Sequence, residues 1–415
     1  MNSFNKFNLP KQLQKALDNN NYIEPTPIQS KVIPLVLENY DLLVQAQTSS
    51  GKTASFVLPL ITKWLENPIE KRSKKDKIKI LILVPTRELA LQVTNTFKLF
   101  STYLPYKPKV ITLIGGDEIG KQLLDIQKGC DIIVATSGRL FDIIDKKQIN
   151  LNFVEHFILD EADKILDLGF IDELQELLKL LPKQKQTLLF SATYSTKILS
   201  IIDTISITPK KITLENSNNI VETIQQKIIL VNSENRSALL RELIRKNRWQ
   251  RVLVFMSSKR ATDNISAKFR KYGFLAESFH GDLIQDDRVY TLDQFKDKKI
   301  KILFSTDIAS RGLHIDNIDC VINYDLPRSS ADYIHRIGRT GRAGQDGIAI
   351  SFVGLDDMEH LQLIEKKIKT KIPQEQIDGF EIIGEFTKKS KGQAPIKGKR
   401  KSKKDKLREM RNSKS

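Results

Sequence analysis

Eight residues near the N-terminus have the order of residue types expected of a phosphate-binding loop. Positions 46–53 read Ala-Gln-Thr-Ser-Ser-Gly-Lys-Thr, after an apolar strand candidate at 41–45 and at the start of a helix candidate. A loop of this kind points backbone N–H groups and the positive end of a helix at one place, which suits a polyphosphate. Lys52 would neutralise the β- and γ-phosphates, and the Thr53 hydroxyl would ligate Mg²⁺. Ala46 stands where the general pattern has glycine, so an ordinary Ser/Gly-rich turn is the alternative for this segment alone. The candidate nucleotide ligands of the loop are Ala46, Gln47, Thr48, Ser49, Ser50, Gly51, Lys52 and Thr53.

Two carboxylates follow a second apolar strand candidate and complement this loop. Asp160 and Glu161 stand at the end of the apolar segment 157–160, and ligands of open α/β sheets bind at the carboxyl ends of strands. Asp160 can hold, largely through water, the Mg²⁺ that bridges the phosphates, and Glu161 can orient and deprotonate an attacking water. A solvated turn or a helix cap is the alternative for the pair taken alone. The loop supplies the ligands for the phosphates, and the pair supplies the metal ligand and the base for the attacking water.

Apolar runs alternate with helical patterns on either side of these groups. The strand candidates of the first half are short, rich in Ile, Leu and Val, and typical of parallel strands covered by helices on both faces. They are 41–45, 78–84, 109–114, 131–135, 157–160 and 187–190, with helix candidates such as 53–65, 87–100 and 171–180 between them. The alternation stops near 209–219, which we interpret as a linker, and restarts with strand candidates at 226–231, 251–256, 301–305, 320–323 and 348–353. The pattern predicts two α/β domains with doubly wound parallel sheets, joined by a short linker.

Length and composition agree with that organisation and narrow the class of protein. With 415 residues, 40% of them apolar, the chain can form two or three domains with sizeable cores. No apolar run reaches the roughly 18–20 residues that span a bilayer, and the N-terminus does not have the pattern of a secretory signal. Cys130 and Cys320 are the only cysteines and lie in different halves of the sequence. They form neither a disulfide framework nor a zinc site, so we expect a cytoplasmic protein without a membrane association.

The net charge of the chain is +17 and is concentrated at the C-terminus. Residues 388–415 contain 13 Lys or Arg and only two acidic residues, a net charge of +11, which leaves +6 for the rest. A mildly basic body with a strongly basic tail indicates a polyanionic partner, most simply nucleic acid. A solvated tail without a function is the alternative.

Residues 160–163, Asp-Glu-Ala-Asp, spell the signature of the DEAD-box RNA helicases, and the chain resembles that family over roughly 4–342. Segment 24–29 is similar to the Q motif of the family. The resemblance implies that Gln29 reads the edge of adenine, where its amide offers both a donor and an acceptor, and that Phe4 stacks on the base. It also implies ATP and Mg²⁺ as cofactors.

The resemblance further implies two tandem RecA-like domains, the second carrying half of the site. We expect an ATP-binding domain with the Q motif at 1–212, a linker at 213–222, a C-terminal helicase domain at 223–370 and a basic, disordered tail at 371–415.

Several segments resemble the RNA-backbone contacts of the family, which offer hydroxyl, amide or guanidinium groups to phosphate and sugar. In the first domain they are 85–90, 115–116 and 136–139, and in the second 280–288 and 305–312. The residues implied to contact RNA are Thr86, Arg87, Gly116, Thr136, Arg139, Arg288 and Thr306.

The same resemblance assigns residues that join hydrolysis to unwinding. Ser191 and Thr193 belong to the segment that couples the two processes, and Gly312 contacts the nucleotide. Residues 335–342, His-Arg-Ile-Gly-Arg-Thr-Gly-Arg, match a further motif of the second domain residue for residue. There Arg339 and Arg342 are implied to reach the γ-phosphate as arginine fingers, and His335 to bridge to the acidic motif.

Three positions depart from the family pattern. Ser49 replaces a glycine of the loop, Ser137 replaces a proline, and His314 replaces an aspartate that contacts the ribose. The loss of that acceptor would weaken ATP binding or relax the choice of nucleotide. Because Lys52, Thr53, Asp160, Glu161, Arg339 and Arg342 are all present, we expect an active ATPase.

The expected function is ATP-dependent local unwinding or remodelling of RNA duplexes and RNA–protein complexes, without sequence specificity. The resemblance is to compact bacterial helicases that act in ribosome assembly or RNA decay, and we expect a monomer. One alternative is a non-hydrolysing RNA clamp or annealing chaperone that relies on the basic tail. The other is a helicase of the wider superfamily that acts on DNA.

Overall fold

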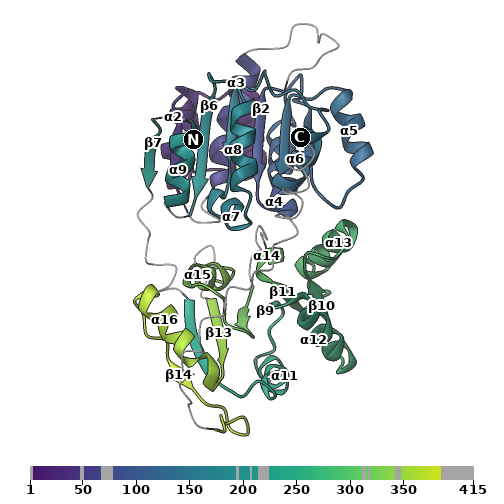
Figure 1. Ribbon diagram of the computed structural model, residues 1–415, viewed down its shortest axis with the longest axis vertical. Helices are drawn as coiled ribbons and strands as arrows, with labels where there is room; N and C mark the ends of the chain where they lie inside the picture. Colours follow the sequence, from purple (N-terminus) through teal and green to yellow (C-terminus); the bar gives the residue numbers. More distant parts are fainter. Residues whose placement is uncertain are drawn as a thin grey trace, which may run out of the picture.

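Two α/β units, each built on a seven-stranded parallel sheet, form the described part of the chain (Figure 1). The computed structural model describes residues 3–46, 51–66, 78–192, 196–205, 208–213, 224–310, 315, 318–341 and 347–384. The strand order is β3-β4-β2-β5-β6-β1-β7 in the first sheet and β10-β11-β9-β12-β13-β8-β14 in the second. Counted from the first strand of each unit, the two orders are the same. The chain therefore contains one fold twice in tandem, which confirms the predicted fold class.

The first unit contains the loop and carboxylates described above. Its strands are β1 (Leu42–Gln45), β2 (Ile80–Val84), β3 (Val110–Leu113), β4 (Ile132–Thr136), β5 (His156–Leu159), β6 (Gln186–Ser191) and β7 (Lys210–Thr213). Its helices are η1 (Ser3–Phe7), α1 (Lys11–Asn19), α2 (Pro27–Leu37), α3 (Lys52–Glu66), α4 (Arg87–Phe100), α5 (Ile119–Gln127), α6 (Ser137–Asp145), α7 (Ala162–Asp167), α8 (Ile171–Leu180) and α9 (Thr196–Ile205).

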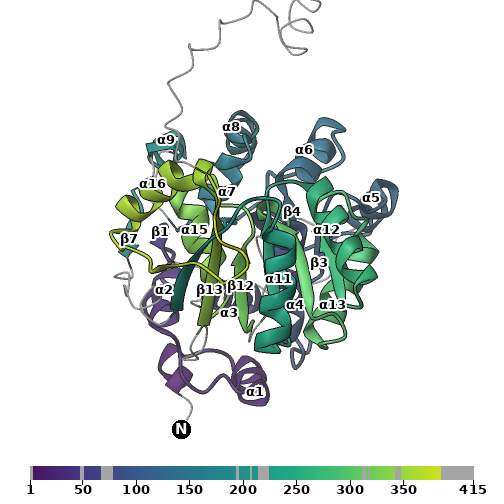
Figure 2. The same cartoon turned by 90° about the horizontal axis from the view of Figure 1, so that it is seen from below.

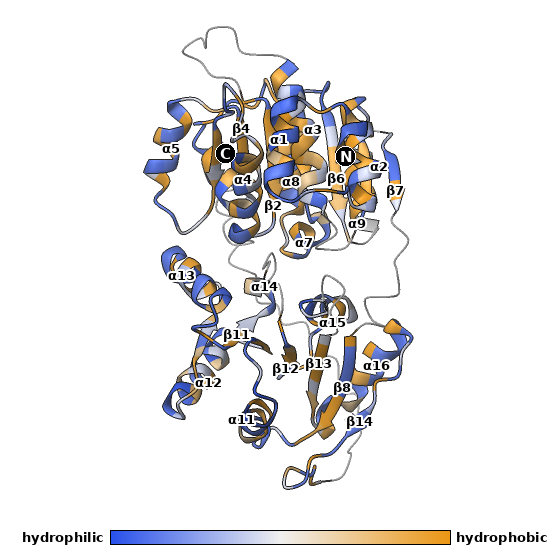
Figure 3. Ribbon diagram, turned by 180° about the vertical axis from the view of Figure 1, so that it is seen from behind, coloured by the Kyte–Doolittle hydropathy of each residue, from blue (hydrophilic) through white to orange (hydrophobic). Residues whose placement is uncertain are grey.

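Successive residues of the strands point into two hydrophobic cores, one on each face of the first sheet. In β1, Leu42 and Val44 pack with helices α1 to α4, whereas Leu43 packs with helices α6 to α9. A strand that is buried on both faces needs an apolar residue at every position, which explains its Ile, Leu and Val content. Figure 3 shows the result as apolar strands between helices with polar outer faces.

The second unit repeats this arrangement. Its strands are β8 (Ile224–Leu230), β9 (Val252–Met256), β10 (Ala276–Phe279), β11 (Ile302–Thr306), β12 (Cys320–Asn323), β13 (Gly347–Val353) and β14 (Gln374–Glu375). Its helices are α11 (Arg236–Asn247), α12 (Lys259–Lys271), α13 (Gln285–Lys296), α14 (Asp307–Ser310), α15 (Ser330–Ile337), η2 (Leu355–Asp357) and α16 (Met358–Ile368). Figure 2 shows β12 and β13 in the middle of the unit, with α11 to α13 on one side and α15 and α16 on the other.

Serine and threonine caps start several of the helices that follow strands. The Thr86 hydroxyl accepts a hydrogen bond from the backbone N–H of Leu89 at 3.3 Å at the start of α4. The Ser329 hydroxyl does the same for Asp332 at 3.1 Å at the start of α15. Each cap satisfies an N–H group that has no partner inside its helix and so sets where the helix begins.

The predicted strands all form, with ends that differ from the observed ones by no more than two residues. One correction concerns the segment interpreted as a linker: its residues Lys210–Thr213 form β7, which pairs with β1. Only Ile212 of this strand is buried. Strands β10 and β14 were not predicted either. All three lie at an edge of a sheet or are polar, so they lack the apolar run that marks a central strand.

The residues just after 370, expected to begin the tail, lie against the second unit. Ile372 is buried in a core with α15 and α16, and β14 pairs with β8. The structure describes the chain up to Gly384. Within the described ranges, no helix is both long enough and apolar enough to cross a membrane.

Candidate active site between the two domains

Gly51 is hydrogen-bonded to Gln29 of α2, the residue predicted to read adenine. Gln29 is buried; its Oε1 accepts from the N–H of Thr26 at 2.9 Å, and its Nε2 donates to the carbonyl of Gly51 at 3.1 Å. Gly51 has a φ of +88°, and a Cβ there would lie 2.7 Å from Gln29 Nε2 and 2.9 Å from Thr26 Oγ1. Glycine is therefore required, because a side chain would meet both a left-handed backbone and this close approach. The adenine contact of Gln29 stays a prediction.

Lys52 and Asp160, predicted from distant parts of the sequence, meet at the end of the first sheet. Lys52 is the first residue of α3, and Asp160 follows β5 directly. Lys52 Nζ lies 3.4 Å from the carbonyl oxygen of Ala46 and 3.9 Å from Asp160 Oδ1, and both side chains are buried. Thr53 follows in α3 and is half-buried. The structure thus brings the predicted phosphate-binding lysine and metal-binding carboxylate to one point.

Glu161 has a strained backbone next to this point. Its φ is +51°, in the left-handed region that costs a residue other than glycine about 1–3 kcal/mol. Asp160 Oδ1 accepts a hydrogen bond from the N–H of Glu161 at 2.9 Å, which helps hold the turn. Glu161 Oε2 lies 2.9 Å from Lys164 Nζ, and both side chains are nearly inaccessible to solvent. Strain of this kind clusters at functional sites, where the surrounding structure maintains it.

The environment moves the pKa values of the two carboxyl groups in opposite directions. Burial raises the pKa of Asp160 to about 6, although the charge of Lys52 opposes this shift. Burial also acts on Glu161, but the charges of Lys164 and Lys52 outweigh it and lower the pKa of that carboxyl to about 2. Glu161 is therefore ionised at neutral pH. Asp160 lacks an equally close cation, so a divalent cation beside it would favour its ionised form.

The second domain contributes Arg339 and His335 to the same charge cluster. Arg339 is 3% exposed, and its charge acts on both Glu161 and Lys164. Burial, together with the charges of Lys164 and Arg339, lowers the pKa of His335 to about 3. His335 is therefore neutral near Glu161, and its expected bridge to the acidic motif stays a prediction. In Figure 1, α7 of the first unit and α15 of the second lie on the facing sides of the two units.

Arg336, three residues before Arg339, is turned into its own domain. Its Nε lies 2.5 Å from Asp307 Oδ1 and its Nη2 2.8 Å from Asp307 Oδ2. Nη1 donates to Asn323 Oδ1 at 3.0 Å and to the carbonyl of Asp325 at 2.6 Å. This network joins α15 to α14 and to the end of β12. The sequence analysis gave Arg336 no role, although the predicted motif contains it.

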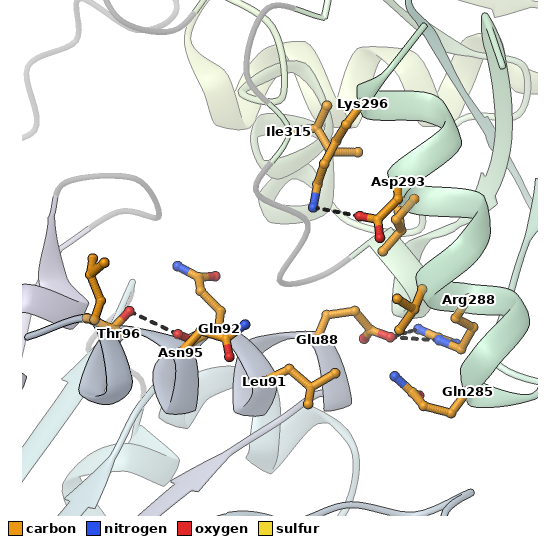
Figure 4. A pocket seen from close by; sticks show the side chains of 13 residues that line it. Glu88, Leu91, Gln92, Asn95, Thr96, Gln285, Arg288, Asp293, Lys296 and Ile315 are labelled. Carbon is orange, nitrogen blue, oxygen red and sulfur yellow. Dashed lines mark hydrogen bonds and ion pairs between the residues drawn. The ribbon is translucent and has the colours of Figure 1, made fainter. Parts of the chain in front are cut away.

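Arg288 forms an ion pair across the domain boundary. Its Nε and Nη2 lie 2.7 Å and 2.5 Å from Glu88 Oε1, and its Nη1 donates to the carbonyl of His280 at 3.0 Å. Both partners line a cavity of about 500 Å³ between α4 and α13 (Figure 4). Arg288 was predicted to contact RNA, but here it is 4% exposed and its nitrogens face protein acceptors. This arrangement supports a role for Arg288 in joining the domains rather than in direct contact with RNA.

Three residues predicted to contact RNA lie together beside this ion pair. Gly116 has a φ of +92°, and a Cβ there would lie 2.8 Å from Cζ of Arg87. The charges of Arg139 and Arg288 act on Arg87, where burial and these charges lower the pKa of the guanidinium. Arg139 donates from Nη2 to the carbonyl of Asp117 at 3.0 Å, while its Nε and Nη1 are buried without a hydrogen-bond partner among the described residues. Arg139 Nε lies 4.0 Å from Asp142 Oδ2, which leaves Nη1 without a polar partner among those residues. A guanidinium donor of this kind next to a further arginine suits a phosphate.

The remaining predicted residues are placed as follows. Phe4 is fully buried and packs edge-on against Phe7 at 5.9 Å between ring centroids. Ser191 ends β6 and is buried. Thr136 and Thr306 end β4 and β11 and are half-buried, and Thr86 caps α4. The following candidates and departures lie outside the described residues: Gln47, Thr48, Ser49, Ser50, Thr193, Gly312, His314 and Arg342.

The described residues of the site fit a nucleotide triphosphate with Mg²⁺. A buried lysine and an interdomain arginine supply positive charge for phosphates, and a buried carboxyl whose pKa is raised supplies an oxygen ligand for a hard cation. Beside the Lys164–Glu161 pair, Asp163 Oδ1 is a buried polar atom without a hydrogen-bond partner among the described residues. A buried polar atom of this kind needs a hydrogen-bond partner, and the waters around a bound phosphate would supply one.

Comparisons with known proteins extend over both domains. The family models described as DEAD/DEAH box helicase and Helicase conserved C-terminal domain match residues 26–201 and 235–344. The chain is 38% identical to ATP-dependent RNA helicase CshA of Listeria monocytogenes, over 90% of this chain and 70% of that protein. It is also 38% identical to ATP-dependent RNA helicase RhlB of Pseudomonas syringae, over 89% of this chain and 93% of that protein.

A solved structure supports the arrangement of the two units. S. cerevisiae Dbp5 bound to RNA and ADP BeF3 superposes with a TM-score of 0.79 at 28% identity, over 91% of this chain and 96% of that chain. Because the superposition spans both units, they are arranged much as in that complex. The sequence motifs, the tandem fold and these matches together lead to one conclusion: the chain belongs to the DEAD-box family of ATP-dependent RNA helicases.

Proposed function

We propose that this chain hydrolyses ATP with Mg²⁺ at the domain interface and uses the cycle to unwind or remodel RNA locally. One observation carries the proposal: Lys52, Asp160 and Glu161 of the first domain share a buried charge cluster with Arg339 of the second. A site divided between two domains works only when the domains are together. Hydrolysis is therefore tied to domain closure.

Each residue of the cluster has a distinct task in this proposal. Lys52 binds the β- and γ-phosphates, and Thr53 and Asp160 hold the metal ion, largely through water. Mg²⁺ supplies charge neutralisation on the phosphate oxygens. Glu161, kept ionised by its cationic neighbours, orients the attacking water and accepts its proton. Arg339 stabilises the charge that develops on the transferred phosphoryl group, an effect worth roughly 10³–10⁵ in rate in related NTPases.

RNA binding is proposed for the cluster of Arg87, Gly116 and Arg139. Their guanidinium and backbone N–H groups suit phosphate and sugar and carry no sequence information. This chemistry supports RNA binding without sequence specificity. ATP and RNA together would close the domains, bend one RNA strand and release the other. Phosphate release would then reopen them.

Steady-state ATP hydrolysis with and without RNA tests the enzymatic part of the proposal. The wild type should show RNA-stimulated turnover, and Glu161→Gln should lower it by about 10²-fold or more, since it removes the general base. A wild-type rate no higher than that of E161Q would contradict the proposal. Strand annealing unaffected by ATP or by Lys52→Ala would instead indicate an RNA clamp or chaperone.

Strand displacement on matched duplexes tests the substrate. An RNA duplex should be separated in the presence of ATP, and a DNA duplex of the same sequence should not. Equal activity on both would point to a DNA-directed helicase.

Partners and location are proposed from the sequence and its resemblance. We infer a cytoplasmic protein, since Cys130 and Cys320 are free cysteines, and a monomer. Ribosomal precursors or RNAs undergoing decay are the proposed substrates, and UV crosslinking followed by sequencing of the bound RNA would test this.

A further inference from the structure

Lys164, the residue that follows the Asp-Glu-Ala-Asp signature, is buried in the charge cluster. It is 2% exposed, which is rare for a lysine. Its Nζ lies 2.9 Å from Glu161 Oε2. This distance allows a charge-assisted hydrogen bond between the ammonium group and the carboxylate. The contact is therefore a buried, hydrogen-bonded ion pair.

The cluster gives Lys164 an unfavourable environment apart from Glu161. Burial lowers the pKa of Lys164, and the positive charges of Arg339 and Lys52 add to this effect, whereas Glu161 opposes it. A buried ammonium group with two cationic neighbours costs free energy that one ion pair offsets only in part. Stability alone therefore does not account for a lysine at this position.

An exposed pair of the same kind shows what a purely structural contact would look like. Lys179 and Glu176 of α8 are also three residues apart in the sequence, and their charged atoms lie 2.7 Å apart with side chains 66% and 71% exposed. Pairs of this type contribute little to stability, because water screens the charges. The Lys164–Glu161 pair has the same spacing and the same charges, but its side chains are only 3% and 6% exposed.

We propose that Lys164 is a positioning residue, which holds Oε2 of Glu161 and thereby leaves Oε1 for the attacking water. This inference rests on the proposed function, in which Glu161 is the general base. The geometry has a clear consequence for orientation. The side chain of Glu161 has three rotatable bonds, and the ion pair with Lys164 restricts rotation about them. A misplacement of about 1 Å at a catalytic group is enough to cost roughly 10²-fold in rate.

Steady-state kinetics of Lys164→Met, Lys164→Arg and the control Lys179→Met test the positioning role. In K164M, kcat with RNA should fall about 10- to 100-fold. The KM for ATP and the affinity for RNA should stay within about twofold, since the phosphate ligands are unchanged. K164R should recover most of the lost kcat, because arginine restores the charge at Oε2. K179M should match the wild type.

A measurement without nucleotide tests the contact independently of activity. In thermal unfolding of the full chain, E161Q and K164M should each lower the midpoint by about 5 °C or more, because each leaves a buried charge without its partner. The E161Q/K164M double variant should lose clearly less than the sum of the two. This variant also carries the test if K164M alone does not fold.

The outcomes separate this inference from the proposed function. If the wild type had no RNA-stimulated ATPase activity, this result would contradict the proposed function itself. An active wild type with K164M within twofold of its kcat would overturn the positioning role, and so would additive losses in the thermal cycle. A drop in kcat in K179M as large as that in K164M would overturn it as well.

Discussion

Arg288 and Glu88 are 200 residues apart in the sequence and form a buried ion pair between the two domains. Arg288 approaches Glu88 Oε1 with both Nε and Nη2, at 2.7 Å and 2.5 Å. Glu88 lies in the first turn of α4, next to Arg87, and Arg288 lies in α13. Each domain thus contributes one half of a contact that exists only when the domains are together, and it lies beside the proposed RNA site.

Removing either partner should weaken domain closure. Glu88→Ala or Arg288→Ala leaves the other charge buried at an interface, which costs about 2–5 kcal/mol. The closed population should therefore fall by about 30-fold or more. Fluorescence energy transfer between dyes on the two domains, with RNA and a non-hydrolysable ATP analogue, measures this change.

The control for this prediction is Arg270→Ala, which breaks the exposed pair with Glu277 inside the second domain. It should leave closure unchanged, because exposed pairs contribute little. The swap Glu88→Arg with Arg288→Glu should recover part of the loss. Closure in E88A equal to that in R270A would contradict the prediction.

Gly51→Ala should impair ATP binding. The methyl group would meet Gln29 Nε2 at 2.7 Å on a left-handed backbone, which costs about 1–3 kcal/mol or distorts the loop. The KM for ATP should rise about tenfold or more. Gly273→Ala is a matched control: its φ is +80°, but no atom lies within 4 Å of the new Cβ. It should lower stability by about 1 kcal/mol and leave the KM for ATP unchanged; an equal rise in KM would show that backbone strain alone is responsible.

Arg336 lies in α15 and Arg339 in the turn that follows this helix, and their replacement should have different effects. Arg339→Ala removes charge that faces the cluster of the first domain, so kcat should fall by roughly 10³-fold or more with the midpoint of unfolding nearly unchanged. Arg336→Ala leaves Asp307 and Asn323 without their buried partner, so the second domain should lose about 3 kcal/mol. Kinetics and thermal unfolding of both variants test this. Equal effects on both quantities would mean that the two arginines share one role.

His335 should make domain closure sensitive to acid. Its pKa is about 3 in this structure, against 6.5 for a free histidine. Burial is the largest cause of this lowering of the pKa, the charges of Lys164 and Arg339 add to it, and those of Glu161 and Asp332 oppose it. Because the pKa is lowered, the stability of the closed arrangement is fully present above pH 6.5 and is lost as the pH falls below that value.

With the ordinary pKa of 6.5 restored in the open arrangement, the loss at pH 5.5 amounts to at most about 1.4 kcal/mol, or roughly tenfold in the closed population relative to pH 7.5. Interdomain energy transfer with the ATP analogue and RNA at the two pH values measures it. The same measurement on His335→Gln is the control, since glutamine does not titrate. An equal pH effect in H335Q would assign the sensitivity to another group.

The basic residues 388–415 should tether RNA while the core acts. Truncation before Lys388 removes a net charge of +11. The apparent KM for RNA should then rise, and its dependence on salt should flatten, because fewer counterions are released on binding. No change in either quantity would leave this segment with a role in solubility alone.

The sequence was sufficient for those features that depend on neighbouring residues. Strands buried on both faces need continuous runs of Ile, Leu and Val, so the central strands could be located within two residues. The phosphate-binding and acidic motifs could be recognised because their chemistry requires particular residue types at short spacing. Strand β7 (Lys210–Thr213) was missed for the complementary reason: an edge strand with one buried residue has no such run.

Residue types and spacing did not predict contacts between the domains, because these depend on how two separately folded units dock; the expected places of His335 and Arg339 came from the family resemblance alone. Nothing in the spacing of Arg336 and Arg339 shows that one binds inside its own domain and the other faces the partner domain. The expectation that Arg288 contacts RNA likewise did not include Glu88, its partner in the first domain. The burial of Lys164 is a further example, since a lysine after a polar motif is exposed in most sequences. The sequence determined which chemical groups are present, and only the tertiary structure decided which of them meet, because docking brings together charges that are far apart along the chain.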